Sequence, residues 1–203
     1  MNHITRAIFA LSILTLSCGP RVLIPPRIDL KPYGTLGLIQ LESNAKGNLA
    51  EYTSLRLLRA VQEAQPGTPV IELGTMSHVL GAIGRNELDI EAVKLLNTKY
   101  GIGAVVAGKL DVQKVKPSIK IGALLQNMTV SAFVEATLVV RLLETNAGAT
   151  VWSNSAQGRE NVASVSLMKG DTWFDAKEPD KAYGNLVDQL VSVITADFWS
   201  HWK

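Results

Sequence analysis

Residues 128–143, MTVSAFVEATLVVRLL, alternate between two kinds of side chain with a period of two. One predicted face carries Met128, Val130, Ala132, Val134, Ala136, Leu138, Val140 and Leu142. The other carries Thr129, Ser131, Phe133, Glu135, Thr137, Val139, Arg141 and Leu143. Because successive side chains of a β-strand point to opposite faces, this alternation predicts a strand in a sheet with one dry and one mixed face.

The chain that follows predicts a hairpin and then a helix. Asn146-Ala147-Gly148 is typical of a hairpin turn, and residues 150–158 fit the returning strand. After a polar stretch at residues 169–181, apolar residues at helical spacing predict a C-terminal helix over residues 181–199. Its inner stripe would be Tyr183, Leu186, Val187, Leu190, Val191, Ile194 and Phe198.

The chain before residue 128 alternates between short apolar runs and helical spacing. The apolar runs predict buried strands at residues 35–41, 70–73 and 104–110. Helices are predicted over residues 47–64 and from a cap at Asp89 to Tyr100. The order β-α-β-α-β-β-β-α predicts an α/β fold, a three-layer or two-layer sandwich whose mixed sheet ends in antiparallel strands and is flanked by helices.

Composition narrows the function classes. The 203 residues are 47% hydrophobic, with 20 basic and 18 acidic side chains, as expected for one folded domain. The near-zero net charge gives no general field that would attract nucleic acid, so we expect no nucleic-acid partner. A single cysteine excludes an internal disulfide framework and a multi-cysteine zinc site. We expect no metal and no cofactor.

The amino-terminal segment has the layout of a secretory signal. Arg6 precedes the uncharged apolar residues 7–16, and Leu16-Ser17-Cys18 follows. The apolar run is about half of the roughly 20 residues that a membrane-spanning helix needs. The segment resembles a bacterial lipoprotein signal, which implies cleavage after residue 17 and acylation (palmitate) of Cys18. The alternative is a simple secretory peptide with an incidental cysteine.

Three segments of the chain are therefore expected: a signal peptide at residues 1–17, a lipidated Cys18 with a proline-rich tether at residues 18–34, and one α/β domain at residues 35–203. Proline favours an extended spacer in the tether. Gly19 stands where enteric-type sorting for inner-membrane retention uses Asp, which favours the outer membrane, facing the periplasm.

Two stretches and the C-terminal helix carry a family resemblance. They are YGIGAVVAGKL at residues 100–110, and LVVRLLET at residues 138–145 followed by Gly148 and Val151-Trp152-Ser153. The arrangement resembles the periplasmic lipoprotein domains of the curli-secretion-channel (CsgG) and TolB-amino-terminal families. That resemblance implies a noncatalytic envelope protein that acts by contact, and it would make residues 110–143 a membrane-inserting hairpin.

Motifs that suggest an enzyme have simpler structural interpretations. Residues 103–109 match G-x-x-x-x-G-K, but Leu110 stands where a phosphate loop needs Ser or Thr, so we interpret the motif as a strand. His78 follows Ser77, and adjacent residues of a helix diverge, so capping by Ser77 is favoured over a nucleophile and base. His201 lies between tryptophans, as in an exposed aromatic end. We expect no enzyme and no catalytic residue.

Two groups of residues are candidates for membrane or partner contact. The first is basic, stands against a single acid, Asp111, and comprises Lys109, Lys114, Lys116 and Lys120. These lysines fit either a solvated edge hairpin or a basic finger for anionic lipid, lipopolysaccharide or an acidic partner. The second is Trp173-Phe174 in the polar stretch, which either fills a core or is presented to a partner.

The leading hypothesis is a noncatalytic lipoprotein of the bacterial envelope that serves as a binding or assembly factor. Its partners would be the membrane, through lipid on Cys18, and envelope proteins, with a homo-oligomer left open. One alternative is an oligomeric outer-membrane secretion-channel subunit that uses hairpin 110–143. The other is an uncharacterised hydrolase.

Overall fold

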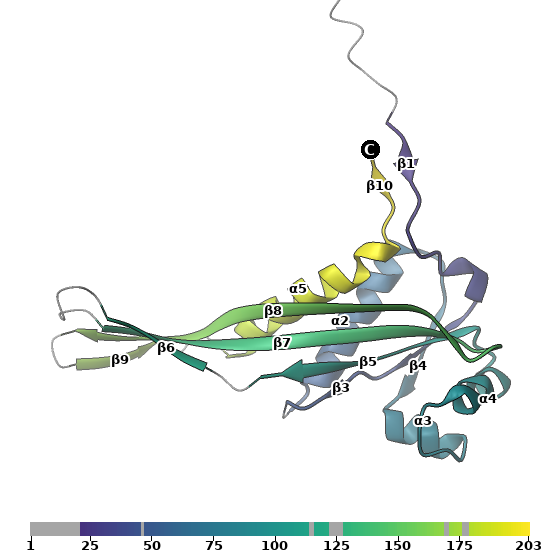
Figure 1. The fold of residues 1–203 in the computed structure, drawn as a ribbon, viewed down its shortest axis with the longest axis horizontal. Coiled ribbons are helices and arrows are strands. Elements are labelled where there is room, and N and C mark those ends of the chain that lie inside the picture. Colours follow the sequence, from purple (N-terminus) through teal and green to yellow (C-terminus); the bar gives the residue numbers. More distant parts are fainter. Residues whose placement is uncertain (1–20, 46, 114–115, 122–127, 169–170, 176–178) are drawn as a thin grey trace, which may run out of the picture.

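The fold is built on a long, twisted, mixed sheet (Figure 1). The computed structural model describes residues 21–45, 47–113, 116–121, 128–168, 171–175 and 179–203, with side chains for 21–45, 47–113, 133–161 and 183–203. Within these ranges the main sheet has eight strands: β2 (Leu36–Ile39), β3 (Glu42–Ser43), β4 (Val70–Gly74), β5 (Ala104–Val112), β6 (Lys116–Ile121), β7 (Met128–Glu144), β8 (Ala149–Met168) and β9 (Asp171–Asp175).

The strand order is β4-β2-β5-β7-β8-β9, and the direction of the strands changes along it. β4, β2 and β5 are parallel, and β3 adds parallel to β5. From β5 onward every pair is antiparallel, with β6 alongside the far half of β7. The predicted mixed sheet with an antiparallel end is confirmed.

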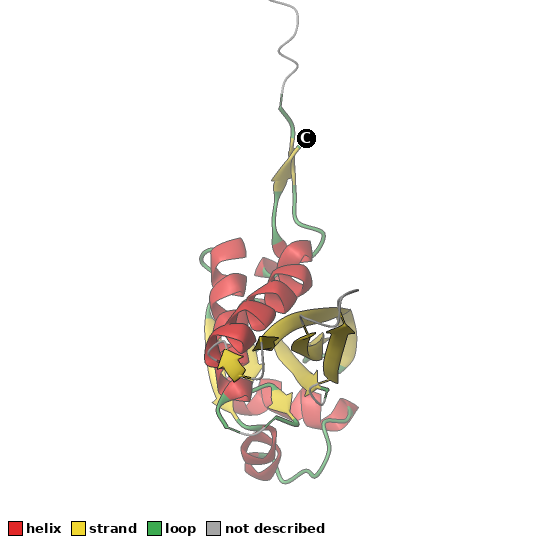
Figure 2. Ribbon diagram, turned by 90° about the vertical axis from the view of Figure 1, so that its left-hand side faces the viewer, coloured by secondary structure: helices red, strands yellow, loops and turns green. Residues whose placement is uncertain are grey.

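In the described part of the chain, four α-helices cover the two faces of this sheet. α2 (Leu49–Ala64) and α5 (Pro179–Thr195) lie on one face, and α3 (Met76–Ala82) and α4 (Ile90–Tyr100) lie on the other (Figures 1 and 2). A 3-10 turn, η2 (Ala196–Phe198), continues α5. The predicted α/β class is confirmed, and where both pairs of helices are present the body has three layers.

The larger core lies under α2 and α5. Leu57 and Val61 of α2 and the apolar stripe of α5 pack on the alternate residues of β7 that the sequence assigns to the dry face. Those with described side chains are all buried: Val134, Ala136, Leu138, Val140 and Leu142. The alternation in the sequence thus correctly identified the face of β7 that packs under helices.

The smaller core lies under α3 and α4, at one end of the sheet. It joins Val79, Val93 and Leu96 of these helices to the second face of β5, through Val105 and Ala107. β5 is therefore covered on both faces there, which explains its nearly continuous apolar run. The rest of that second face extends beyond these helices.

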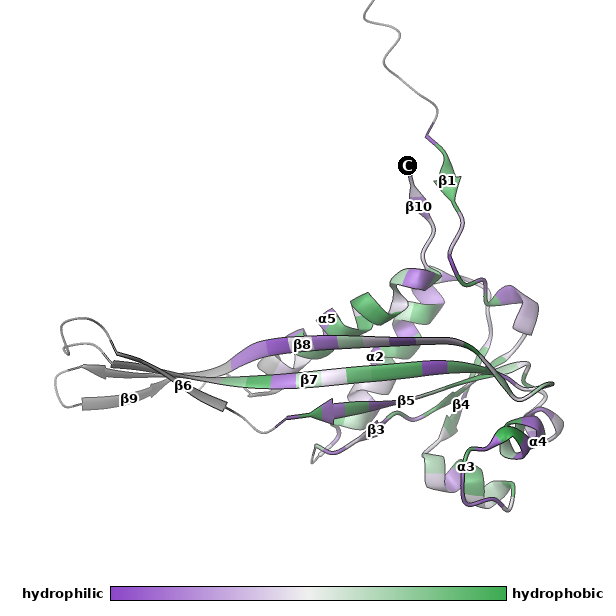
Figure 3. Cartoon of the chain, in the orientation of Figure 1, coloured by the Kyte–Doolittle hydropathy of each residue, from purple (hydrophilic) through white to green (hydrophobic). Residues whose placement is uncertain are grey.

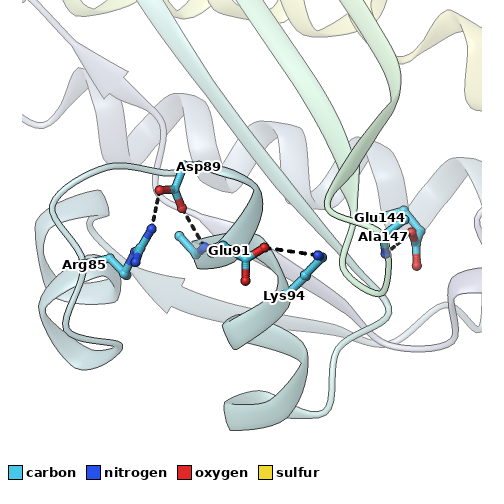
Figure 4. Close-up of polar contacts among 7 residues, drawn as sticks. Arg85, Asp89, Glu91, Lys94, Glu144 and Ala147 are labelled. Carbon is cyan, nitrogen blue, oxygen red and sulfur yellow. Dashed lines mark hydrogen bonds and ion pairs between the residues drawn. The ribbon is translucent and has the colours of Figure 1, made fainter.

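Two polar groups fix the end of the sheet beside α4 (Figure 4). Asp89 caps α4 by accepting the Ala92 N–H at 2.8 Å and pairs with Arg85, and these donors lower the pKa of the Asp89 carboxyl. Glu144 accepts the N–H of Ala147 at 2.8 Å in the β7–β8 turn. The predicted cap of α4 and the turn at residues 146–148 are confirmed.

Several predicted elements differ from those observed. β8 runs to Met168 rather than to residue 158, because pairing with β7 and β9 continues through a polar sequence. Residues 171–175, expected in a loop, form β9. α5 begins and ends a few residues before the predicted helix 181–199. Thr75, rather than Ser77, caps α3, and its hydroxyl accepts the His78 N–H at 3.3 Å.

The segment before residue 35 contacts the body. Leu30 is buried in the larger core and is followed by a 3-10 turn, η1 (Lys31–Tyr33). Nearer the amino terminus, β1 (Leu23–Ile24) pairs antiparallel with β10 (His201–Trp202) and forms a two-stranded ribbon. The lipidation site Cys18 lies outside the described residues, and whether residues 18–34 act as a tether stays a prediction.

Candidate functional site

On its second face, a broad part of the sheet is covered by none of the helices that the structure describes. We call it the uncovered face and define it by its residues from β5, β7 and β8: Lys109, Asp111, Glu135, Thr137, Val139, Arg141, Ser153, Ser155, Gln157 and Arg159. It lies opposite the layer of α2 and α5 and extends beyond α3 and α4 (Figure 1).

The strand register brings these residues together in rows. Lys109 pairs with Val139, and Val139 pairs with Ser155, so these three residues form one row across three strands. Asp111, Thr137 and Gln157 form the next row. Directly paired residues of antiparallel strands share a face, which makes each row a set of neighbouring side chains.

The residues of the uncovered face point away from α2 and α5, because the residues next to them along each strand point toward these helices. Leu110, Leu138 and Ala156 alternate with them and are buried in the larger core. An added Cβ on Gly158 would lie 2.6 Å from Leu186 Cδ1, so Gly158 also faces α5. Since side chains alternate along a strand, Ser155 and Gln157 point away from the helices, and both are exposed.

One end of the uncovered face carries an ion pair within β5. Lys109 Nζ lies 2.8 Å from Asp111 Oδ1, with both side chains about half exposed. This hydrogen bond, with the attraction of the two charges, raises the pKa of Lys109. The lysine therefore stays charged, but part of its charge is neutralised by Asp111 in the same strand.

Its other end carries an aromatic contact. The Arg159 guanidinium lies 3.9 Å from the centre of the Phe133 ring, and its Nε is 4.0 Å from Glu135 Oε1. A cation held over a ring face is attracted by the ring's quadrupole. In the strand register Thr137 shares a row with Asp111 and Ser155 shares one with Lys109, while Ser153 pairs with Arg141 in the next row. The face therefore offers hydroxyl groups beside charged side chains.

The uncovered face presents a regular array of polar side chains. It is a strand surface with fixed backbone spacing, and its side chains carry hydroxyl, amide and paired charged groups. Among the described residues, no group of three or more His, Cys, Asp and Glu side chains could hold a metal ion. No helix in the described ranges has the length and apolar character needed to cross a membrane.

The predicted lysines fall on two strands. Lys109 is on β5 and belongs to the uncovered face. Lys116 and Lys120 are on β6, paired with Phe133 and Thr129 of β7, while Lys114 lies outside the described residues. Pro117 sits within β6 opposite Ala132. Among the described strands β6 pairs with β7 alone, and proline is tolerated on such an edge strand.

Trp173 and Phe174 lie on the other edge strand of the same end of the sheet. In β9 they pair with Ser166 and Val165 of β8. β6 and β9, with residues 128–133 of β7 and 164–168 of β8 to which they pair, thus form one antiparallel end, which we call the distal arm (Figure 1). Of the two predicted groups, the structure brings Lys116 and Lys120 and the pair Trp173-Phe174 into this arm. They lie on separate edge strands, since β7 and β8 lie between β6 and β9.

The motifs that suggested an enzyme lie in a strand and a short helix. Residues 104–109 are part of strand β5, and an added Cβ on Gly103 would lie 1.9 Å from the Tyr33 carbonyl oxygen, so close chain contact accounts for this glycine. His78 and Ser77 are exposed on α3, and the Ser77 hydroxyl lies 3.2 Å from that of Thr75. The rejection of a phosphate loop is supported by this strand conformation.

Sequence analysis missed the β8 part of the uncovered face. Polar residues at positions 153, 155, 157 and 159 alternate with Trp152, Asn154, Ala156 and Gly158. That period of two was the available signal. It identifies an outward face but does not indicate whether another layer covers it.

Comparison of the chain with known proteins finds similarity to solved structures alone. No protein-family model matches the chain, and no curated protein does. Among solved structures, the PelC dodecamer from Paraburkholderia phytofirmans aligns with a TM-score of 0.46 and 9% identity, over 91% of this chain and 99% of that chain. The lipoprotein GNA1162 from Neisseria meningitidis aligns with a TM-score of 0.39 and 20% identity, over 63% and 83% of the two chains.

The C-terminal domain of LpoB from Escherichia coli aligns with a TM-score of 0.38 and 13% identity, over 64% of this chain and 87% of that chain. Because each of these TM-scores is below 0.5, the likenesses carry no argument about this chain. The resemblance to the CsgG and TolB-amino-terminal families stays a prediction.

Proposed function

We propose that this chain is a noncatalytic lipoprotein of the bacterial envelope, held by lipid on Cys18 at the outer membrane and facing the periplasm. It acts as a binding or assembly factor, and the uncovered face is where it binds a partner protein. The observation that carries the proposal is the uncovered face itself, a sheet surface that α2 and α5 support from behind.

The support behind the face makes it a rigid surface for docking. β7 is hydrogen-bonded to β5 on one side and to β8 on the other, so its backbone polar groups are satisfied within the sheet. The larger core fixes the reverse side through Leu138 and Val140. A partner would therefore meet side chains whose backbone positions change little on binding.

The composition of the face favours a protein over a bare membrane surface. It contains three basic and two acidic side chains, and Asp111 and Glu135 lie beside Lys109 and Arg159. With two of the three basic side chains paired, the net charge of the face is 3 − 2 = +1, which gives little attraction to anionic lipid. Such a mixture of charges suits the polar contacts of a non-obligate protein interface. Val139, which is 37% exposed, supplies an apolar centre.

Site-specific photo-crosslinking in living cells tests this proposal. A photoreactive amino acid at Ser153 and one at Ser155 should capture the same envelope protein, because the two side chains lie on the same face of β8. The matched control is Ser192, an exposed serine on the outer side of α5. Val139→Asp should abolish capture from Ser155 while the protein stays folded. Equal capture from Ser192, or capture that Val139→Asp leaves unchanged, would contradict the proposal.

A secretion-channel subunit is the second candidate function, and the strand lengths favour keeping it. β7 has 17 residues and β8 has 20, whereas a membrane-spanning strand needs about 9–11. In this case the predicted hairpin 110–143 would insert as part of the distal arm. If the protein with Cys18→Ala is a detergent-free monomer by light scattering, this candidate is excluded.

A further inference from the structure

The ribbon of β1 and β10 carries an unusual concentration of exposed apolar side chains. Leu23 and Trp202 are direct partners in its register, and they are 49% and 65% exposed. Val22, beside them, is 59% exposed, and Trp199 at the base of the ribbon is 43% exposed. A tryptophan that exposed in water needs a reason, because its large apolar ring is normally covered.

The charged side chains of the ribbon are all basic. Its backbone is paired from Val22 to Lys203, with the Lys203 N–H donating to the Val22 carbonyl at 3.0 Å. Among residues 21–24 and 199–203 the charged side chains are Arg21 and Lys203, and no carboxylate side chain occurs. Aromatic rings beside basic side chains are the combination found where proteins meet the headgroups of a bilayer.

The position of the ribbon agrees with that environment. It projects from the body at the point where the described chain begins (Figures 1 and 3). In the sequence, Cys18 precedes Arg21 by three residues. Three residues of extended chain span at most about 10 Å, which limits how far Arg21 can lie from an acylated Cys18. The headgroup region of one leaflet is roughly 5–8 Å thick. The lipid would therefore bring the ribbon to the membrane surface.

The base of the ribbon is fixed to the body. The buried Gln65 side chain accepts the Leu30 N–H at 2.7 Å and donates to the Ile28 and Phe198 carbonyls, so it holds both strands' connections to the domain. The Ile28 N–H also donates to the Asp197 carbonyl at 3.1 Å. A ribbon held in this way would fix the angle of the whole domain relative to the membrane.

We propose that the β1–β10 ribbon is a second membrane contact, in which Leu23, Trp199 and Trp202 enter the bilayer interface beside the lipid on Cys18. This inference rests on the proposed lipoprotein function. Its consequence is a domain held at a set angle to the bilayer, with residues from near both described ends of the chain at the membrane.

Tryptophan quenching by lipid tests the proposal. The full protein is purified from the membranes of its host and reconstituted in vesicles of phosphatidylethanolamine and phosphatidylglycerol with brominated acyl chains. Much of its tryptophan fluorescence should be quenched. The double variant Trp199→Phe/Trp202→Phe should lose most of that quenching. The control is Trp152→Phe, because Trp152 is buried in the core and donates to Asp197 at 3.0 Å.

A second pair of variants tests the ribbon without removing a fluorophore. Leu23→Ser should lower the quenching of Trp202, because Leu23 is its register partner. Leu55→Ser on α2 replaces a leucine of nearly equal exposure, 47%, and should leave quenching unchanged. If the double tryptophan variant is quenched like the unmodified protein, or if Leu23→Ser and Leu55→Ser behave alike, the ribbon does not enter the interface.

The mass of the same purified sample separates this inference from the proposed function. Quenching that depends on Trp202 in a protein without acyl groups would support the ribbon and contradict lipidation. An acylated protein whose quenching is independent of Trp202 would support lipidation and contradict the membrane contact of the ribbon.

Discussion

Gly108 of β5 lies where an added Cβ atom would clash with the backbone of the neighbouring strand β7. A Cβ at this position would lie 2.4 Å from the Val139 carbonyl oxygen and 3.1 Å from Val140 Cα, which are backbone atoms of β7. The backbone of a central strand cannot move aside without loss of pairing on both of its edges. The glycine therefore permits the close approach of β5 and β7 beneath the larger core.

Gly108→Ala should lower the free energy of unfolding by about 1–3 kcal/mol, as overpacking does in other cores. Urea denaturation monitored by circular dichroism measures it. The control is Gly81→Ala in α3, where no atom lies within 4 Å of the added Cβ. That change should stabilise the protein slightly, since alanine is the better helix former. Equal effects of the two substitutions would contradict the packing argument.

Gln65 is the residue on which the connections of both ribbon strands depend. Replacing it by leucine keeps the side-chain volume but removes the partners of the Leu30 N–H and of two carbonyls. Gln65→Leu should cost roughly 2–4 kcal/mol, because buried polar groups lose their hydrogen bonds. Thermal or urea unfolding is the measurement. Gln62→Leu, at an exposed position of α2, the helix that ends just before Gln65, should change stability by less than about 0.5 kcal/mol.

Among the secondary-structure elements, those with a strong local signal could be predicted from the sequence. β7 was found because one face of its alternating pattern is entirely apolar. α4 was found because Asp89 caps it and Gly101, with φ 65°, ends it in a left-handed conformation. The distal half of β8 was missed because Gln157 to Asn161 (QGREN) is polar on both faces, and its strand conformation comes from pairing with β7.

The β7–β8 turn gives a pH-dependent prediction. The N–H groups of Ala147 and Asn146 donate to the Glu144 carboxylate and lower its pKa below the ordinary 4.5. A lowered pKa stabilises the fold fully above the unfolded value, and the contribution is lost as the pH falls through the folded value. Glu144→Gln should therefore lower the melting temperature at pH 7.

The difference between Glu144→Gln and the unmodified protein should shrink below about pH 4.5, where the unfolded carboxylate takes up its proton. Calorimetry at pH 7 and pH 3 measures it. Glu63→Gln, at an exposed glutamate of α2, is the matched control and should leave the melting temperature unchanged. A difference for Glu144→Gln that is as large at pH 3 as at pH 7 would show that the turn does not depend on the carboxylate.

At the scale of the whole molecule, three surfaces lie on three sides of one body: the ribbon, the uncovered face and the distal arm (Figure 1). Their arrangement could not be predicted from the sequence. Strands of two residues, such as β1 and β10, have no periodic pattern, and residues 23 and 202 become neighbours only after folding. Likewise, Lys109 was identified by its charge, but its place in one row with Val139 and Ser155 follows from the register of three strands.

The claim that unites these surfaces is attachment by lipid at Cys18. Intact-mass spectrometry of the protein purified from the membranes of its natural host tests this directly. We predict a chain that begins at residue 18, with its mass increased by acyl groups that localise to Cys18 on digestion. An unmodified cysteine sulfur, or a chain that still carries residues 1–17, would contradict the account.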